Sequence, residues 1–263
     1  MSTRIDTTDI GCIAESRVLL DSLDDATFIS LGVLCGTDLC VLGGIRHSAC
    51  WEPLKIAWCK LDERKRQQLT QTSMLAMRDR DLVVEPPLGR GIEALTVPAC
   101  YKVSARLHIL LCARESPAFM IATHHESRIP AVTYFQPWGT NAIVQEVPER
   151  VGGADPSSPR SPLDVMFSYR LSTQAFAAAE LARWALKPIP AGRRQPKPPR
   201  LICFFGRTES GRADSYQLTV HRTGKKAHID GPDISADFTG HQLTRFLADV
   251  ITRWAGTHCP SLG

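Results

Sequence analysis

Short apolar runs bounded by turn residues recur along much of the chain, a pattern typical of β-strands. The runs FISLGVLC (28–35) and LCVLGGI (39–45), separated by Gly36, Thr37 and Asp38, predict a hairpin. Three further strands are predicted at 118–124, 131–135 and 141–147, where Pro and Gly separate the runs. They suit an antiparallel meander. The segment SARLHILLCA (104–113) is compatible with either a helix or a strand.

The segment LDERKRQQLTQTSMLAMRDRDLVV (61–84) has a different period. Its apolar residues recur about every seven positions, which leaves one narrow apolar stripe on a polar helix. A strand follows at its end. Many winged-helix DNA-binding domains end their recognition helix in this way, so we tested the segment for that role. The preceding stretch WEPLKIAWCK contains Pro53 near its start, which argues against a partner helix there.

Two segments, 172–186 and 242–256, resemble each other at a constant offset of seventy residues. Phe176 aligns with Phe246, and Trp184 aligns with Trp254. Each segment has the spacing of a helix with both aromatics on one face. The helix at 172–186 follows a predicted strand at 163–171. The helix at 242–256 follows a predicted strand at 201–207 and a predicted hairpin around Thr223–Gly224. A chance match of two amphipathic helices is the alternative.

The fold class predicted from these patterns is α+β. We expect antiparallel sheet covered by helices, in a quasi-twofold arrangement of two strands-then-helix units, with Trp184 and Trp254 as buried anchors. Two Pro-rich segments, 148–162 and 188–199, have no apolar period and predict loops or linkers. The predicted organisation is an acidic N-terminal segment at 1–27, a first α+β half at 28–187, a Pro-rich basic linker at 188–200, a second half at 201–256 and a tail at 257–263.

Composition and charge narrow the classes of function. The 263 residues carry a formal net charge of only +4, well short of the basic excess that a dedicated phosphate-backbone binder usually has. No apolar run approaches the roughly 18 residues of a membrane span, and no secretory leader is recognisable, so we expect a cytoplasmic protein. An odd number of cysteines, without a spaced framework, predicts reduced and largely buried thiols. They are Cys12, Cys35, Cys40, Cys50, Cys59, Cys100, Cys112, Cys203 and Cys259.

The chain contains none of the catalytic motifs whose spacing carries a mechanism, and we predict that it is not an enzyme and holds no cofactor or metal. In the sequence HHE, only His124 and Glu126 would converge on one metal ion, because strand neighbours point to opposite faces; a solvated strand end is the alternative. Cys35 and Cys40 lack the paired knuckle spacing of a zinc site. Ser210, in GRTESGR (206–212), is a candidate nucleophile, but a flexible hairpin loop explains this segment equally well.

The charges of segment 61–84 argue against a DNA-reading face. Its basic side chains are interleaved with acidic ones, and Asp79 and Asp81 lie where a wing would approach phosphate. The basic linker at 187–200 supplies the remaining support for nucleic-acid binding. We therefore keep a winged-helix-like nucleic-acid-binding regulator as the alternative function.

The order of patterns over residues 51–254 resembles EspG-type proteins, which are associated with type VII (ESX) secretion in actinobacteria. The resemblance consists of a helix with Glu-Arg near its start that ends in LAMRDRDLV, then LTVPACYKVSARLHILLCARESPAFMIATHH, a set of strands, a helix of the STQAFAAAELARWAL type and a second strand-helix unit. The N-terminal region, with SLGVLCGTDLCVLGGI, departs from that pattern.

The resemblance implies a quasi-twofold α+β fold and a non-enzymatic cytosolic chaperone. Such a protein holds helical type VII secretion substrates by the apolar tip of a helical hairpin. The expected partner is therefore a protein, with nucleic acid and membrane insertion not expected. No partner-binding residue can be transferred from the family.

Overall fold

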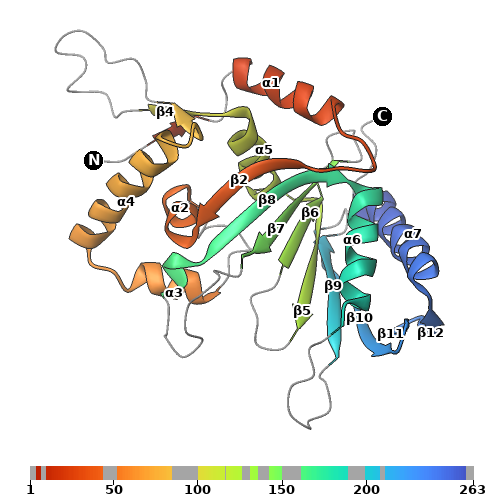
Figure 1. Ribbon diagram of the computed structural model, residues 1–263. Helices are drawn as coiled ribbons and strands as arrows, with labels where there is room; N and C mark the ends of the chain where they lie inside the picture. Colours follow the sequence, from red (N-terminus) through yellow and green to blue (C-terminus); the bar gives the residue numbers. More distant parts are fainter. Residues whose placement is uncertain are drawn as a thin grey trace, which may run out of the picture. The chain divides into compact units, whose positions relative to one another are not determined.

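The computed structural model describes most of the chain, and its helices and strands are labelled in Figure 1. The described residues are 4–6, 10–43, 52–84, 100–115, 117–125, 131–135, 142–149, 161–188, 199–207 and 211–258. Most of the two Pro-rich segments lies outside these ranges.

Nine described strands form the larger sheet. In chain order they are β2 (Ile29–Cys35), β5 (Phe119–His125), β6 (Ala131–Phe135), β7 (Ala142–Pro148), β8 (Met166–Thr173), β9 (Arg200–Arg207), β10 (Ala213–Thr223), β11 (Lys226–Gly231) and β12 (Ile234–Phe238). Their order across the sheet is β12-β11-β10-β9-β5-β6-β7-β8-β2. The described registers of its pairs are antiparallel, including the predicted meander β5-β6-β7 and the hairpin β10-β11.

Three short strands form a second, smaller sheet, which shares no strand with the larger one. They are β1 (Arg4–Asp6), β3 (Val83–Val84) and β4 (Cys100–Val103). β4 is central, parallel to β1 and antiparallel to β3. The predicted helix-to-strand passage at 61–84 is confirmed, because a helix ends at Arg78 and β3 begins at Val83 after a short turn.

The described residues form seven α-helices. These are α1 (Ile10–Asp21), α2 (Gly36–Val41), α3 (Glu52–Cys59), α4 (Glu63–Arg78), α5 (Ala105–Glu115), α6 (Gln174–Leu186) and α7 (Gly240–His258). With helices that pack on an antiparallel sheet, the predicted α+β class is confirmed. The ambiguous segment 104–113 is helical, as α5.

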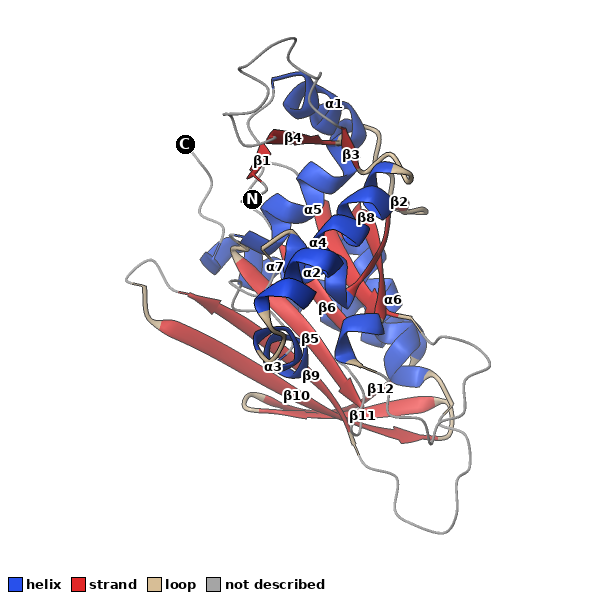
Figure 2. Ribbon diagram, turned by 90° about the vertical axis from the view of Figure 1, so that its left-hand side faces the viewer, coloured by secondary structure: helices blue, strands red, loops and turns tan. Residues whose placement is uncertain are grey.

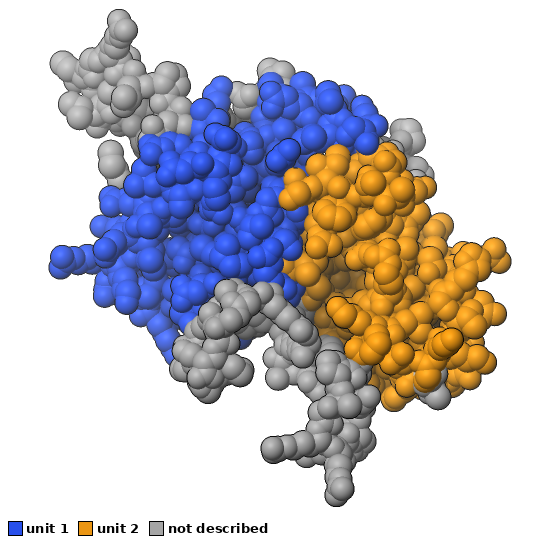
Figure 3. Space-filling view, viewed as in Figure 1, with its two compact units in different colours: residues 1–22, 31–115, 148–169 blue, residues 23–30, 116–147, 170–263 orange. Residues whose placement is uncertain are grey.

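The chain divides into two compact units, which have separate colours in Figure 3. Unit 1 comprises residues 1–22, 31–115 and 148–169, and unit 2 comprises 23–30, 116–147 and 170–263. Each unit therefore combines stretches that are distant in the sequence, whereas the sequence had suggested consecutive halves at 28–187 and 201–256.

The core of unit 2 lies between its strands and the two helices α6 and α7, which run side by side (Figure 1). Alternate residues of the strands face these helices: Ile202 and Phe204 of β9 are fully buried, as are Leu218 of β10 and Ile229 of β11. This alternation is the expected consequence of the two-residue period of a strand with one helix-covered face.

We predicted that the two similar helices cover two separate sheets, and this prediction was wrong. Both α6 and α7 belong to one core cluster and pack on strands of one sheet. α6 contributes small buried residues, among them Ala178 and Ala182, to this core, in which it contacts α7. Trp184 and Trp254 pack against this core but are partly rather than fully buried.

Unit 1 holds the helices α1 to α5 and the smaller sheet. α1 packs on α5, where Ser16 Oγ donates to the carbonyl oxygen of Cys12 at 2.8 Å and lies 3.1 Å from Nδ1 of His108. α4 begins at a cap in which the Asp62 carboxylate accepts from the backbone N–H of Lys65 at 2.7 Å. It ends before Asp81, whose φ of 56° is left-handed.

Two local predictions in unit 1 were wrong. The strand predicted at 39–45 does not begin at residue 39, because residues 36–41 form helix α2; residues 44 and 45 lie outside the described residues. Cys35 and Asp38 supply a reciprocal capping box that satisfies the exposed backbone N–H groups and starts this helix. Residues 52–59 form helix α3 despite Pro53, since proline is tolerated in the first turn of a helix, where its missing N–H has no partner to lose.

Candidate functional site

A pocket of about 260 Å³ opens in unit 2 between the start of β10 and the last turns of α7. Alternation along β10 directs Asp214 and Tyr216 toward the helix-covered side of the sheet, on which Leu218 is buried. The side chains that give the pocket its chemistry are Asp214 and Tyr216 of β10, Asp233 of the β11–β12 turn, and Arg253, Trp254 and His258 of α7. The pocket thus combines two carboxylates with one guanidinium and one imidazole on an aromatic wall.

His258 is held in place from three sides. Its Nδ1 lies 2.8 Å from the carbonyl oxygen of Arg207, and its ring stacks on Trp254 with centroids 4.5 Å apart. Gly206 of β9 allows the ring to lie against the strand, because a Cβ there would come within 3.0 Å of Nδ1. The side chain is only 1% exposed. The orientation of the imidazole is therefore fixed, with Nε2 toward Asp214 at 3.4 Å.

Tyr216 and Asp233 form the second polar pair of the pocket. The phenol donates to Oδ1 of Asp233 at 2.5 Å, and a guanidinium nitrogen of Arg253 lies 3.8 Å from the other carboxylate oxygen. Burial, together with the hydrogen bond to the Asp233 carboxylate, raises the pKa of Tyr216 to about 12. The phenol consequently keeps its proton near neutral pH and serves as a hydrogen-bond donor.

The arrangement is suited to binding. Among the described side chains, no hydroxyl or thiol is hydrogen-bonded to His258, so the pairing of nucleophile and base that covalent catalysis uses is not formed there. Its polar atoms instead converge on a space that is open to solvent beside Asp214 and Asp233, both of which are about half exposed.

The opposite side of the same strands presents a second candidate site. α6 and α7 both pack on one side of the sheet of unit 2, whose strands β9 and β10 run side by side in Figure 2. On the other side, Phe205 is 41% exposed and pairs with Ser215, and the same face of β10 continues through Gln217 and Thr219 to His221. We name Phe205, Ser215, Gln217, Thr219 and His221 the open face.

A polar cluster continues from the open face onto β11 and β12. Nδ1 of His228 lies 2.8 Å from Oδ1 of Asp237, and its Nε2 lies 3.3 Å from Oδ1 of Asp230. The hydrogen bond with Asp237 is the main cause that raises the pKa of His228. The hydroxyl of Ser235, which donates to Asp230 at 2.8 Å, is the main cause that lowers the pKa of that carboxyl.

This cluster predicts a pH dependence of stability. Because the pKa of His228 is raised in the folded state, its stabilising contribution is fully present below the ordinary value of 6.5 and is lost as the pH rises through the folded pKa. We expect Asp237→Asn to lower the pKa of His228 and to weaken this dependence. Imidazole proton NMR across the titration measures the pKa, and urea unfolding above and below it measures stability. An unchanged pKa in the variant would contradict the assignment.

The candidate residues identified from sequence do not come together in one site. His124 lies at the end of β5, opposite Leu201, while the side chain of His125 and all of Glu126 and Ser210 lie outside the described residues. In the part of the chain that the structure describes, no three His, Cys, Asp or Glu side chains are grouped so as to hold a metal ion.

Cys35 and Cys40 both belong to the region of α2, where they are structural. The Sγ of Cys35 accepts from the backbone N–H of Asp38 at 3.5 Å, and burial raises the pKa of this thiol. Cys40 is buried in the helix. Their spacing in the sequence thus reflects a helix cap rather than a ligand set.

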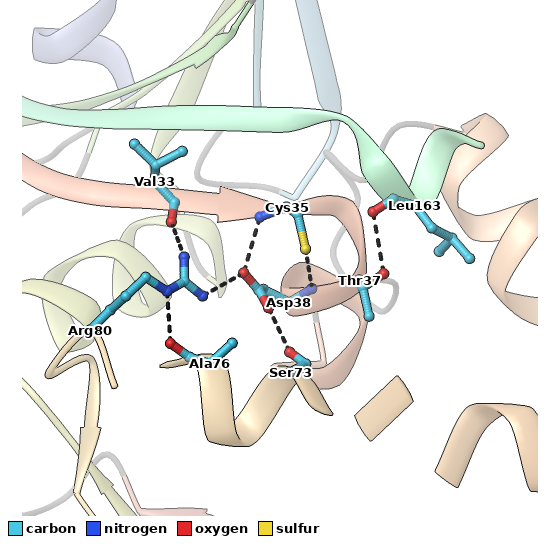
Figure 4. Close-up of polar contacts among 8 residues, drawn as sticks. All are labelled: Val33, Cys35, Thr37, Asp38, Ser73, Ala76, Arg80 and Leu163. Atoms are coloured by element: carbon cyan, nitrogen blue, oxygen red, sulfur yellow. Dashed lines mark hydrogen bonds and ion pairs between the residues drawn. The ribbon is translucent and has the colours of Figure 1, made fainter. Parts of the chain in front are cut away.

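Asp38 is the centre of a buried polar network in unit 1 (Figure 4). Its carboxylate accepts from the backbone N–H of Cys35 at 3.1 Å, from Ser73 Oγ at 2.6 Å and from Arg80 Nη2 at 2.8 Å. Arg80 also donates to the carbonyl oxygens of Val33 at 2.6 Å and Ala76 at 2.9 Å. One carboxylate and one guanidinium therefore tie together β2, α2 and the end of α4.

This network changes the interpretation of α4. Arg80, one of the cations expected to approach phosphate in a DNA reader, is bonded to Asp38 instead. Arg78 lies 3.4 Å from Asp79, and Arg66 lies 3.8 Å from Glu63. Both ends of the helix thus combine cations that contact carboxylates with exposed acidic side chains, which is unfavourable for contact with a polyanion.

No protein-family model, curated protein or solved structure matches the chain. None of the described helices is long and apolar enough to cross a lipid bilayer.

Two spacings in the sequence indicate residues that share a face and line the pocket. Trp254 and His258 are four residues apart on one helix face, and Asp214 and Tyr216 are two apart on one strand face. Each spacing identifies a shared face. What the sequence could not give is that these two faces meet, since that depends on how α7 packs across β10.

Proposed function

We propose that the protein is a non-enzymatic protein-binding module, an EspG-type chaperone that holds helical type VII secretion substrates in the cytoplasm. The observation that carries this proposal is the open face, where Phe205 is 41% exposed beside the uncharged polar residues Ser215 and Gln217. The family part of the proposal is supported by the resemblance over residues 51–254.

The open face has the composition of a recognition surface. Protein interfaces are enriched in aromatic residues and depleted of charge at their centre, and a few large side chains supply most of the binding free energy. Phe205 is such a side chain: its neighbour Phe204 is fully buried under the helices, whereas Phe205 is 41% exposed. A strand places it rigidly, so that its ring is in position before a partner arrives.

A nucleic-acid-binding regulator is the second candidate, and one observation favours it. The helix-to-strand passage from α4 to β3 is present as in a winged-helix reader. The engagement of Arg66, Arg78 and Arg80 by carboxylates and the mild net charge place this candidate behind protein binding.

The experiment compares two ligands at two salt concentrations by calorimetry: a purified helical-hairpin type VII substrate and a DNA duplex. Binding of the substrate is expected to depend only weakly on salt, because apolar contact is not screened as exposed charge pairs are. Duplex binding would fall steeply with salt, since it relies on released counterions. Tight, sequence-selective duplex binding at near-physiological salt, lost when Arg64, Arg66, Arg193 and Arg194 are replaced by Ala, would overturn the protein-binding proposal.

A further inference from the structure

In the pocket between β10 and α7, Nε2 of His258 and Oδ2 of Asp214 face each other, and both are hydrogen-bond acceptors when the imidazole is neutral. Nδ1 of His258 lies 2.8 Å from the carbonyl oxygen of Arg207, and because a carbonyl only accepts, Nδ1 must carry a proton. In the neutral imidazole, Nε2 is then an acceptor. It lies 3.4 Å from Oδ2 of Asp214, which is longer than the roughly 2.7–2.9 Å of a charge-assisted hydrogen bond. A donor that reaches both atoms would complete the site.

The charges of the pocket indicate what kind of donor fits. Arg253 offsets Asp233, with the two groups 3.8 Å apart, and Asp233 also accepts from Tyr216. Asp214 has no described partner of opposite fixed charge, since its one described ion-pair contact is with His258. With a neutral imidazole the pocket therefore carries one uncompensated negative charge, which favours a ligand with a single positive charge.

We infer that the pocket binds an alkylammonium group whose N–H groups donate to Nε2 of His258 and to the carboxylate of Asp214. Val250 and Trp254 line the same pocket and provide apolar contact for the alkyl chain. An ammonium suits the site better than a metal ion, because an ion would need a third protein ligand and the described residues offer no such group. This inference goes beyond the proposed function, since the pocket lies on the helix-covered side of the sheet.

The size of the pocket limits the ligand. Its volume of about 260 Å³ is below the range of about 300–1,000 Å³ that is common for drug-sized ligands, which favours a small ligand. A chain of a few methylene groups with a terminal ammonium does fit. Two sources share this chemistry: the side chain of a lysine in another protein, and a free alkyl diamine.

The test uses n-butylammonium as the probe, followed by NMR of the ¹⁵N-labelled histidine rings. We expect the Nε2 resonance of His258 to shift on titration with a Kd of about 1 mM, as for a small weak ligand. Neutral n-butanol should give no such shift. Two further titrations, with Nα-acetyl-lysine methylamide and with putrescine, identify which source binds more tightly, and tighter binding by either supports the inference.

Two variants provide the specificity control. Asp214→Asn keeps the shape of the side chain and should weaken binding about tenfold or more, because it removes a charge-assisted hydrogen bond. Asp237→Asn makes the same change on the opposite side of the same sheet and should leave binding unchanged. Equal binding by Asp214→Asn and the parent would overturn the inference. So would a ligand-free protein whose His258 ring is doubly protonated at neutral pH and does not respond to butylammonium.

Discussion

Replacing Asp38 by asparagine is expected to lower the free energy of unfolding by about 2–4 kcal/mol, because it removes an almost fully buried carboxylate and leaves its hydrogen-bond donors unsatisfied. Asp38 is only 3% exposed and accepts hydrogen bonds from Cys35, Ser73 and Arg80. The amide nitrogen of asparagine would face at least one of these donors. The loss should appear in urea unfolding as a lower midpoint.

A neighbouring residue supplies the matched control. Asp81→Asn removes the same charge one residue after Arg80, at an exposed position whose φ of 56° suits asparagine as well as aspartate. Its stability should stay within about 0.5 kcal/mol of the parent, as for most exposed substitutions. If both variants unfold at the same urea concentration, the network in Figure 4 does not brace unit 1.

Replacing Arg200 by methionine is expected to cost about 3 kcal/mol or more, because several carbonyl groups at the end of α6 would lose a charged donor together. The buried guanidinium donates to the carbonyl oxygens of Trp184, Ala185 and Lys187 and lies 5.2 Å from the ring of Trp184. A cation at this position also interacts favourably with the negative end of the helix dipole.

Arg222→Met is the matched control for Arg200→Met. Arg222 is exposed on β10 of the same sheet, and removal of its charge should change stability by no more than about 0.5 kcal/mol. Circular dichroism during urea unfolding compares the two proteins. An Arg200→Met protein as stable as Arg222→Met would show that the end of α6 does not depend on this side chain.

The elements that the sequence predicted well are those with purely local determinants. The meander β5-β6-β7 follows from apolar runs separated by Pro and Gly, and the hairpin β10-β11 follows from Gly224, which has a φ of 63° in the turn. α4 follows from its apolar stripe and from the capping residue Asp62.

The prediction of a strand at 39–45 failed because the contacts that start helix α2 do not appear in the hydrophobic pattern. Residues 39–45 have the composition of a strand, but the capping box of Cys35 and Asp38 and the close approach of Gly36 to the backbone of Pro162 make a helix the better solution. A Cβ at residue 36 would come within 2.5 Å of the carbonyl oxygen of Pro162, so the helix start depends on a residue distant in the sequence.

Tertiary packing also determines which sheet the similar helices α6 and α7 cover. The match of Phe176 with Phe246 and of Trp184 with Trp254 correctly indicated two amphipathic helices that bury related faces. It gave no information on whether these faces cover one sheet or two. Nor did it show that Trp254 would stack on His258 beside Asp214, because that geometry depends on the path of α7 over β10.

The central claim is that the protein binds a helical substrate through the open face, and substitution of two equally exposed phenylalanines tests it most directly. Phe205 is 41% exposed on the open face, and Phe28 is 42% exposed elsewhere in unit 2, against Phe176. The measurement is calorimetric binding of a purified helical-hairpin type VII substrate to Phe205→Ser, Phe28→Ser and the parent, after unfolding has shown that all three are folded. We predict that Phe205→Ser weakens binding about thirtyfold, as expected for an aromatic hot spot, and that Phe28→Ser binds as the parent does. Equal affinities of Phe205→Ser and the parent, or no binding by any of the three proteins, would contradict the account.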